Sequence, residues 1–182
     1  MVKRVLVSGA FGFLVLMIWT FVVNGIFGLT LRTEMKQIPA ERIVYQVLKE
    51  HIASPGVYVV NPALMPEGGF PPGEPVFSVR YSGFEHGLAG RMAIVEPALV
   101  LIAAVLVAWL LSMTSSRVLA SYAHKVAFVF AVGLVHAVSK DLGEIGIGGN
   151  PAYVGVILAA NRVASWTLAG LVMARTMKGS ET

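Results

Sequence analysis

Arg162 lies near the middle of an apolar segment, residues 151–174, that is long enough to cross a lipid bilayer. Insertion scales put the cost of a charged side chain at the centre of a membrane helix at about 2.5–3.5 kcal/mol, so such a group needs a partner. Glu96 lies a few residues inside the outer end of an earlier apolar segment and carries the opposite charge. Because an ion pair keeps both groups ionised, we expect Arg162 and Glu96 to join the second and fourth spans.

Other polar residues fall in the same half of the predicted spans. His136 and Lys140 lie one helical turn apart, and Asp141 follows them. Asn161 adjoins Arg162, and Asn24 lies near the outer end of the first span. The pattern predicts an outer-leaflet polar cluster whose members are Glu96, His136, Lys140, Asp141, Asn161, Arg162 and Asn24. A structural ion pair is the favoured role; the alternatives are docking of another subunit's span, binding of an anionic lipid, quinone or small acid, and a proton relay.

The sequence contains no recognisable catalytic or cofactor motif. It has no cysteine, no phosphate-binding loop, no G-x-S-x-G and no HExxH. His51, Glu85 and His86 fit no compact metal motif, and a lone membrane histidine cannot supply bis-histidine haem ligation. We therefore expect no metal, no cofactor and no catalytic activity.

Composition places the chain among membrane proteins. Of its 182 residues, 56% are hydrophobic and 13% are charged, whereas soluble domains average about 45–50% and 25%. Windows of membrane-spanning length cover residues 5–29, 92–113, 118–139 and 153–174. The first apolar run exceeds the length of a cleaved signal peptide, so we interpret residues 1–29 as a signal anchor that forms the first span.

Basic residues predict the orientation. With four spans, one side receives Lys3, Arg4, Arg117, Lys125, Arg175 and Lys178. The positive-inside rule makes that side cytoplasmic, which places both termini inside and residues 30–90 outside a bacterial inner membrane. The net charge of +4 does not cluster on one soluble face, so we expect no nucleic-acid partner.

Residues 30–90 are too long for a simple connector and are predicted to contain their own structure. Apolar residues recur at helical spacing over residues 43–52, and residues 57–60 and 76–81 are strand-like. Between the strands lies a Pro/Gly-rich loop, residues 61–75. The predicted fold is an all-α membrane protein, a four-transmembrane-helix bundle with a small α+β extracytoplasmic domain between helices 1 and 2. Residues 91–178 then form a three-helix region.

The segment GVYVVNP at residues 56–62, followed by three spans that end in LAGLVMA, resembles a family of small bacterial membrane proteins. Members of that uncharacterised family have four spans and an extracytoplasmic Gly-Val-Tyr-Val-x-Pro-like motif. Here Pro62 comes one residue later than in that motif. The resemblance implies the four-span topology and no activity.

These observations favour a non-catalytic accessory or scaffolding subunit of a larger inner-membrane assembly. Its partners would be the lipid bilayer and other membrane subunits. The alternative is a small-molecule or lipid-binding, transport-related protein whose site is the outer-leaflet polar cluster. A third hypothesis, an integral-membrane enzyme, would need His51 or His86 to approach that cluster.

Overall fold

The computed structural model describes residues 2–60, 73–85, 90, 93–146 and 149–177. This part of the chain is mostly helical, with one two-stranded sheet. Within the described residues, four helices are long and apolar enough to cross a membrane: Val2–Ile26, Val95–Ser112, Tyr122–Leu142 and Ala152–Thr176. The four predicted apolar helices are therefore confirmed, with their ends shifted by a few residues. Most of the predicted loop 61–75, residues 61–72, lies outside the described residues.

The elements follow one another along the chain without a repeat. The first span is α1 (Val2–Thr20), which continues into the π-helical turn η1 (Phe21–Ile26). Next come α2 (Leu29–Thr33), α3 (Glu41–His51), β1 (Gly56–Val60) and β2 (Phe77–Tyr81). The remaining elements are α5 (Val95–Ser112), α6 (Ser116–Ala120), α7 (Tyr122–His136), the π-helical turn η3 (Ala137–Leu142) and α8 (Ala152–Thr176).

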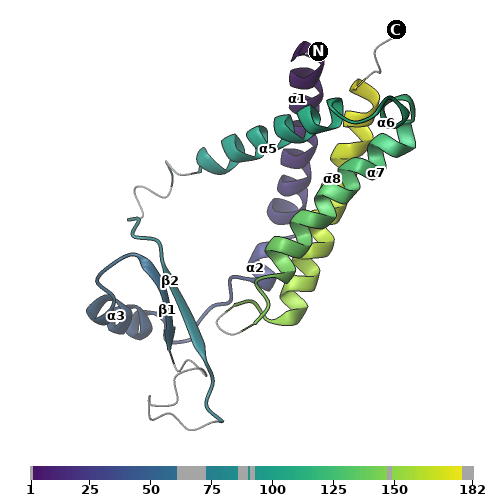
Figure 1. Cartoon of the computed structure of the whole chain (residues 1–182). Helices are drawn as coiled ribbons and strands as arrows, with labels where there is room; N and C mark the ends of the chain where they lie inside the picture. The colour runs from purple at the N-terminus through teal and green to yellow at the C-terminus, as the bar shows by residue number, and fades with distance from the viewer. Residues whose placement is uncertain (1, 61–72, 86–89, 91–92, 147–148, 178–182) are drawn as a thin grey trace.

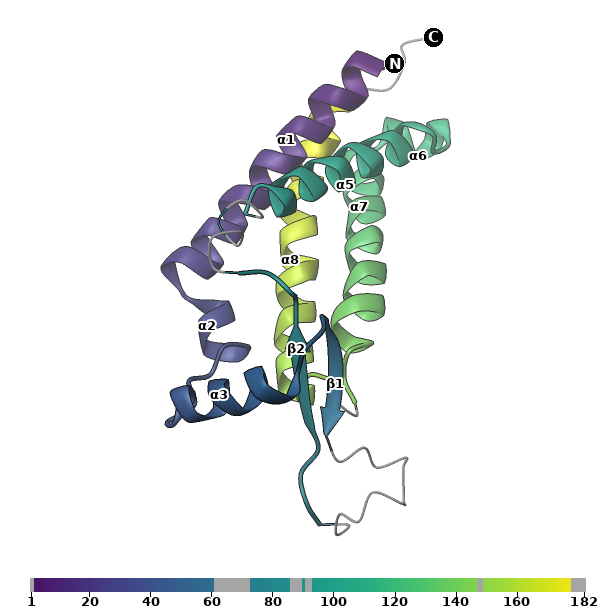
Figure 2. The same cartoon turned by 90° about the vertical axis from the view of Figure 1, so that its left-hand side faces the viewer.

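Helix α8 is the centre of the bundle and packs along both α1 and α7, while α5 packs mainly on α1. Leu111, Val129 and Met173 are fully buried where these helices meet. The first residues of α1, the last residues of α8, and α6 lie at one end of the bundle, and α2, α3 and the sheet lie at the other (Figures 1 and 2). We call these the terminal end and the cap end.

Small residues let the helix backbones approach one another closely. A Cβ atom added at Gly133 of α7 would lie 2.6 Å from the Cβ of Trp166 in α8. A Cβ atom at Gly9 of α1 would lie 2.8 Å from the Cα of Val105 in α5. In lipid, no hydrophobic driving force brings apolar helices together, so van der Waals contacts between closely packed helices stabilise the bundle.

Helix α5 follows a different direction from the other spans. Figure 1 shows it crossing α1 and leaving the bundle toward the sheet. Its C-terminal half packs against the bundle, because Ala104, Ala108 and Leu111 are fully buried. Its N-terminal half does not pack against the bundle, because Leu99 and Ile102 are more than half exposed.

The cap consists of α3 and the antiparallel ribbon β1–β2, in which Tyr58 is paired with Val79. The predicted helix and both predicted strands are present. Val44 and Leu48 of α3 are half-buried, whereas Ile43 and Val47 on the same apolar stripe are exposed. Pro39 precedes α3, which begins at Glu41.

A buried lysine closes the terminal end of the bundle. Lys125 near the start of α7 is 8% exposed and donates a 2.8 Å hydrogen bond to the carbonyl oxygen of Met177, the C-cap of α8. A cation at this position also interacts favourably with the negative end of the α8 dipole. Lys125 therefore fixes where α8 ends relative to α7.

We predict that Lys125→Met lowers the free energy of unfolding by about 2 kcal/mol, the typical contribution of a hydrogen bond to a charged group. Methionine keeps the apolar stem and loses the donor. Denaturant unfolding in detergent micelles measures the effect, with His124→Met on the adjacent exposed position as the control. Equal losses in the two variants would contradict a specific role for the Lys125 ammonium.

Candidate functional site

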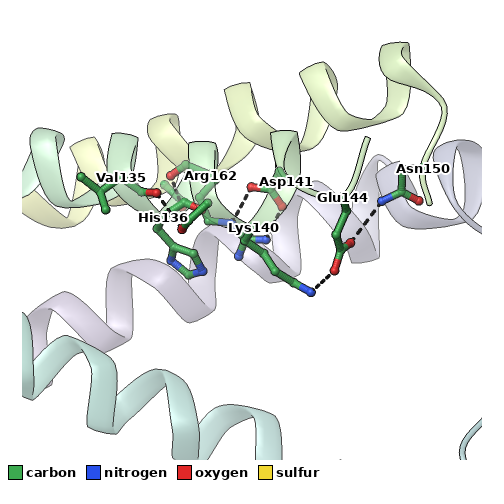
Figure 3. A network of polar contacts seen from close by, with 9 residues as sticks. Val135, His136, Lys140, Asp141, Glu144, Asn150 and Arg162 are labelled. Carbon is green, nitrogen blue, oxygen red and sulfur yellow. Dashed lines mark hydrogen bonds and ion pairs between the residues drawn. The ribbon is translucent and has the colours of Figure 1, made fainter. Parts of the chain in front are cut away.

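Arg162 forms a two-point ion pair with Asp141. Its Nε donates to Asp141 Oδ2 at 2.9 Å, and its Nη2 donates to Asp141 Oδ1 at 2.8 Å (Figure 3). The Asp141 side chain is only 4% exposed, and that of Arg162 is 34% exposed. Two parallel charge-assisted hydrogen bonds make this the strongest polar contact between η3 and α8.

The predicted pair between Arg162 and Glu96 is not formed. Glu96 lies in the first turn of α5, is exposed, and belongs to no ion pair among the described residues. The reason is the direction of α5, whose N-terminal half leaves the bundle and carries Glu96 away from α8 (Figure 1). Arg162 thus joins the third and fourth spans, where the second and fourth were expected.

A π-helical turn explains why Asp141 faces Arg162. In η3, the Gly143 amide donates to the Val138 carbonyl five residues earlier, at 3.0 Å. Because a π turn takes more residues than an α turn, the buried positions continue from Gly133 through Ala137 to Asp141. Lys140, the predicted cluster member one residue before Asp141, is exposed.

Two other predicted members lie next to this pair. The His136 ring packs at a tilt against Trp166, with ring centroids 6.5 Å apart. Lys140 forms an ion pair with Glu144, which also accepts a hydrogen bond from Asn150 at 3.4 Å. Figure 3 shows these contacts as a row that extends from His136 toward the turn before α8.

The two predicted asparagines are held separately. Asn161 accepts a 2.8 Å hydrogen bond from Trp19 Nε1, which links α8 to α1. Asn24 accepts a 3.0 Å hydrogen bond from Thr30, within the connection from η1 to α2. The expected cluster is therefore not one site. Asn161, Asn24 and Glu96 lie apart from it, and only His136, Lys140, Asp141 and Arg162 remain together.

Sequence reasoning missed the polar contacts at the terminal end. Ser8 is fully buried and donates to the Met173 carbonyl oxygen at 3.4 Å, and Thr176 donates to the Ser8 hydroxyl at 3.1 Å. Serine and threonine are common in membrane helices, so no sequence signal marks these two. Polar contacts thus occur at both ends of the bundle, whereas the sequence indicated the outer half.

A cavity of about 900 Å³ opens at the cap end, between α2, β2 and the turn that follows η3. Its walls include Glu34, Arg80 and Glu144. Lys36, which follows the wall residue Met35, donates a 3.0 Å hydrogen bond to the Tyr153 hydroxyl, and this contact raises the pKa of Lys36. None of Glu96, His136, Lys140, Asp141 and Arg162, the residues expected to line an outer cavity, lines this one.

The Arg162–Asp141 pair is suited to holding helices together. Each charge neutralises the other, and no described buried side-chain nitrogen or oxygen lacks a hydrogen-bond partner. Within the described part of the chain, no three His, Cys, Asp or Glu side chains are arranged to hold a metal ion. The geometry therefore supports a structural connection between the third and fourth spans.

No protein-family model matches this chain, and searches of curated proteins and of solved structures give no significant match. The family resemblance carried by residues 56–62 thus stays a prediction, and functional inference rests on the geometry described above.

Proposed function

We propose that this protein is a non-catalytic accessory or scaffolding subunit of a larger assembly in a bacterial inner membrane. The proposal has both termini in the cytoplasm and residues 30–90 outside it, as a small α+β domain inserted between the first two spans. The positions of the basic residues support this orientation. So does the arrangement of the chain, since the start of α1, the end of α8, and α6 lie at the end opposite the cap (Figure 1).

One observation carries the proposal: none of the described residues between positions 24 and 103 is buried. This stretch includes the whole described cap and the projecting half of α5. An isolated two-stranded ribbon is at best marginally stable in water and needs another layer to cover it. Helix α3 lies near β2, but Val44 and Leu48 of the helix and Val79 of the strand are only half-buried.

The uncovered surface of the cap is apolar. Ile43 and Val47 of α3 are 69% and 50% exposed, and Phe77 of β2 is 59% exposed. Other large apolar side chains between residues 38 and 84 are also exposed: Ile38, Tyr45, Val57, Val60 and Phe84. Much exposed apolar surface on a small segment is typical of a protein–protein interface, so a partner subunit would cover the cap.

We predict that Ile43→Lys combined with Val47→Lys weakens partner binding at least tenfold, which corresponds to about 1.4 kcal/mol. Both side chains are exposed, so the change leaves the interior of the protein intact. The measurement is the amount of partner that co-migrates with the protein on a native gel after mild-detergent extraction from native membranes, with mass spectrometry of the band.

The matched control is Gln46→Lys combined with Glu50→Gln, which adds the same charge on the polar side of α3. The control should retain the partner. If the unaltered protein migrates alone or as a simple homo-oligomer, the accessory role is wrong. Loss of the partner in both double variants would indicate a charge effect without a specific apolar interface.

The cavity at the cap end favours a second candidate function, that of a small-molecule or lipid-binding protein. Its volume of about 900 Å³ falls within the usual range for ligand sites, about 300–1,000 Å³. In this form the hypothesis no longer depends on Arg162, because Asp141 satisfies that guanidinium. It depends on the residues of the cavity wall.

A further inference from the structure

The cavity has charged groups of opposite sign on different walls. Arg80 projects from β2, and Glu34 follows α2 directly. Both are exposed, and neither forms an ion pair or a side-chain hydrogen bond with a described residue. The other charged wall residue, Glu144, is already paired with Lys140 and bonded to Asn150. The guanidinium of Arg80 and the carboxylate of Glu34 are therefore available to bind a ligand.

This pair of charges selects the class of ligand. A guanidinium offers a planar set of donors that matches the oxygens of a phosphate or carboxylate. A carboxylate is an acceptor that suits the three donors of a primary ammonium. A singly charged ligand would leave either Arg80 or Glu34 without a partner, whereas a zwitterion with an anionic and an ammonium end satisfies both.

The position of the cavity narrows the class further. Its wall includes the turn that joins the third and fourth spans. In the proposed four-span topology, those two spans leave the bilayer at this turn. Tyr153 lies in the first turn of α8, three residues after the wall residue Asn150, and tyrosine is typical of the membrane interface. Lipid head groups occupy this depth, and their anionic group is a phosphate.

We propose that this cavity binds a phosphoethanolamine group, with its phosphate on Arg80 and its primary ammonium on Glu34. The group can come from the head of a bilayer lipid or from a free, water-soluble molecule. This proposal rests on the second candidate function, a small-molecule or lipid-binding protein, and specifies its ligand. It does not depend on the accessory role, because a chain that lacks partner subunits would still retain the ligand.

The experiment is native mass spectrometry of the full chain released from nanodiscs. The discs hold equal amounts of phosphatidylethanolamine, phosphatidylcholine and phosphatidylglycerol. We expect the unaltered protein to retain phosphatidylethanolamine at least tenfold over the other two lipids. Arg80→Gln should reduce its retention at least tenfold, and Glu34→Gln should reduce it to the level of phosphatidylcholine, which has no ammonium N–H. The charge-matched controls on α3, Arg42→Gln and Glu41→Gln, should behave as the unaltered protein does.

A second arm distinguishes the two sources of the ligand. Free phosphoethanolamine is added to detergent-purified protein: displacement of bound lipid identifies a site that accepts the soluble molecule, and no displacement identifies a lipid site. Equal retention of the three lipids overturns the proposal, as does a preference that survives in both cavity variants or is lost equally in the controls. Because the cavity charges are exposed and unpaired in the described structure, the variants should fold, and unchanged melting temperatures verify this.

Discussion

Replacement of Asp141 by leucine is expected to lower the free energy of unfolding by about 3 kcal/mol. Loss of one partner of a buried ion pair usually costs about 3–5 kcal/mol, because the other charge is left buried without compensation. The lower end of that range applies here, since the Arg162 side chain is 34% exposed and can partly reach water. Denaturant titration in detergent micelles measures the change.

Two further variants separate the charge effect from a packing effect. Glu144→Gln removes a carboxylate from the exposed pair with Lys140, and exposed pairs contribute at most about 1 kcal/mol. Asp141→Leu combined with Arg162→Leu should recover most of the stability, because apolar replacements of a buried pair are often neutral. A double variant no more stable than Asp141→Leu alone would show that leucine disturbs η3 for steric reasons, without a role for the stranded charge.

Gly133→Leu should cost about 3 kcal/mol and separate α7 from α8. A Cβ atom at Gly133 would lie 2.6 Å from the Cβ of Trp166, closer than real Cβ contacts allow. Trp166 is 5% exposed and packed within the core, so it cannot move aside. Overpacking of a filled interior costs about 1–3 kcal/mol, and the upper end applies because the contact lies next to the tryptophan backbone.

The measurement for Gly133→Leu is again unfolding in detergent, with Ala131→Leu as the control. Ala131 lies on the exposed side of the same helix, where leucine meets only lipid or detergent. The control should change stability by less than about 0.5 kcal/mol, as surface substitutions do. A small effect at Gly133 would mean that α7 and α8 can shift apart without loss, and that their close approach contributes little.

The sequence by itself determined the four apolar helices and both strands of the ribbon. These depend on local properties: a long apolar run forms a helix because its backbone must satisfy its own hydrogen bonds in lipid, and alternating β-branched and aromatic residues favour strands. Small residues spaced along the fourth span, among them Gly155 and Ala169, are buried. Burial within one helix follows from its own periodicity.

Only the tertiary structure decided which residue pairs with Arg162. Glu96 and Asp141 both fall in the outer half of the predicted spans, and the sequence alone favoured Glu96 as the partner. Two features then selected Asp141: the direction of α5, which removes Glu96, and the π turn in η3, which rotates Asp141 inward. Neither feature can be read from the local sequence. The direction of α5 is set by its contacts with other helices. The π turn is set by which backbone hydrogen bonds form in that one turn. Charge pairing is a contact between segments, so it follows the packing of the helices more than their composition.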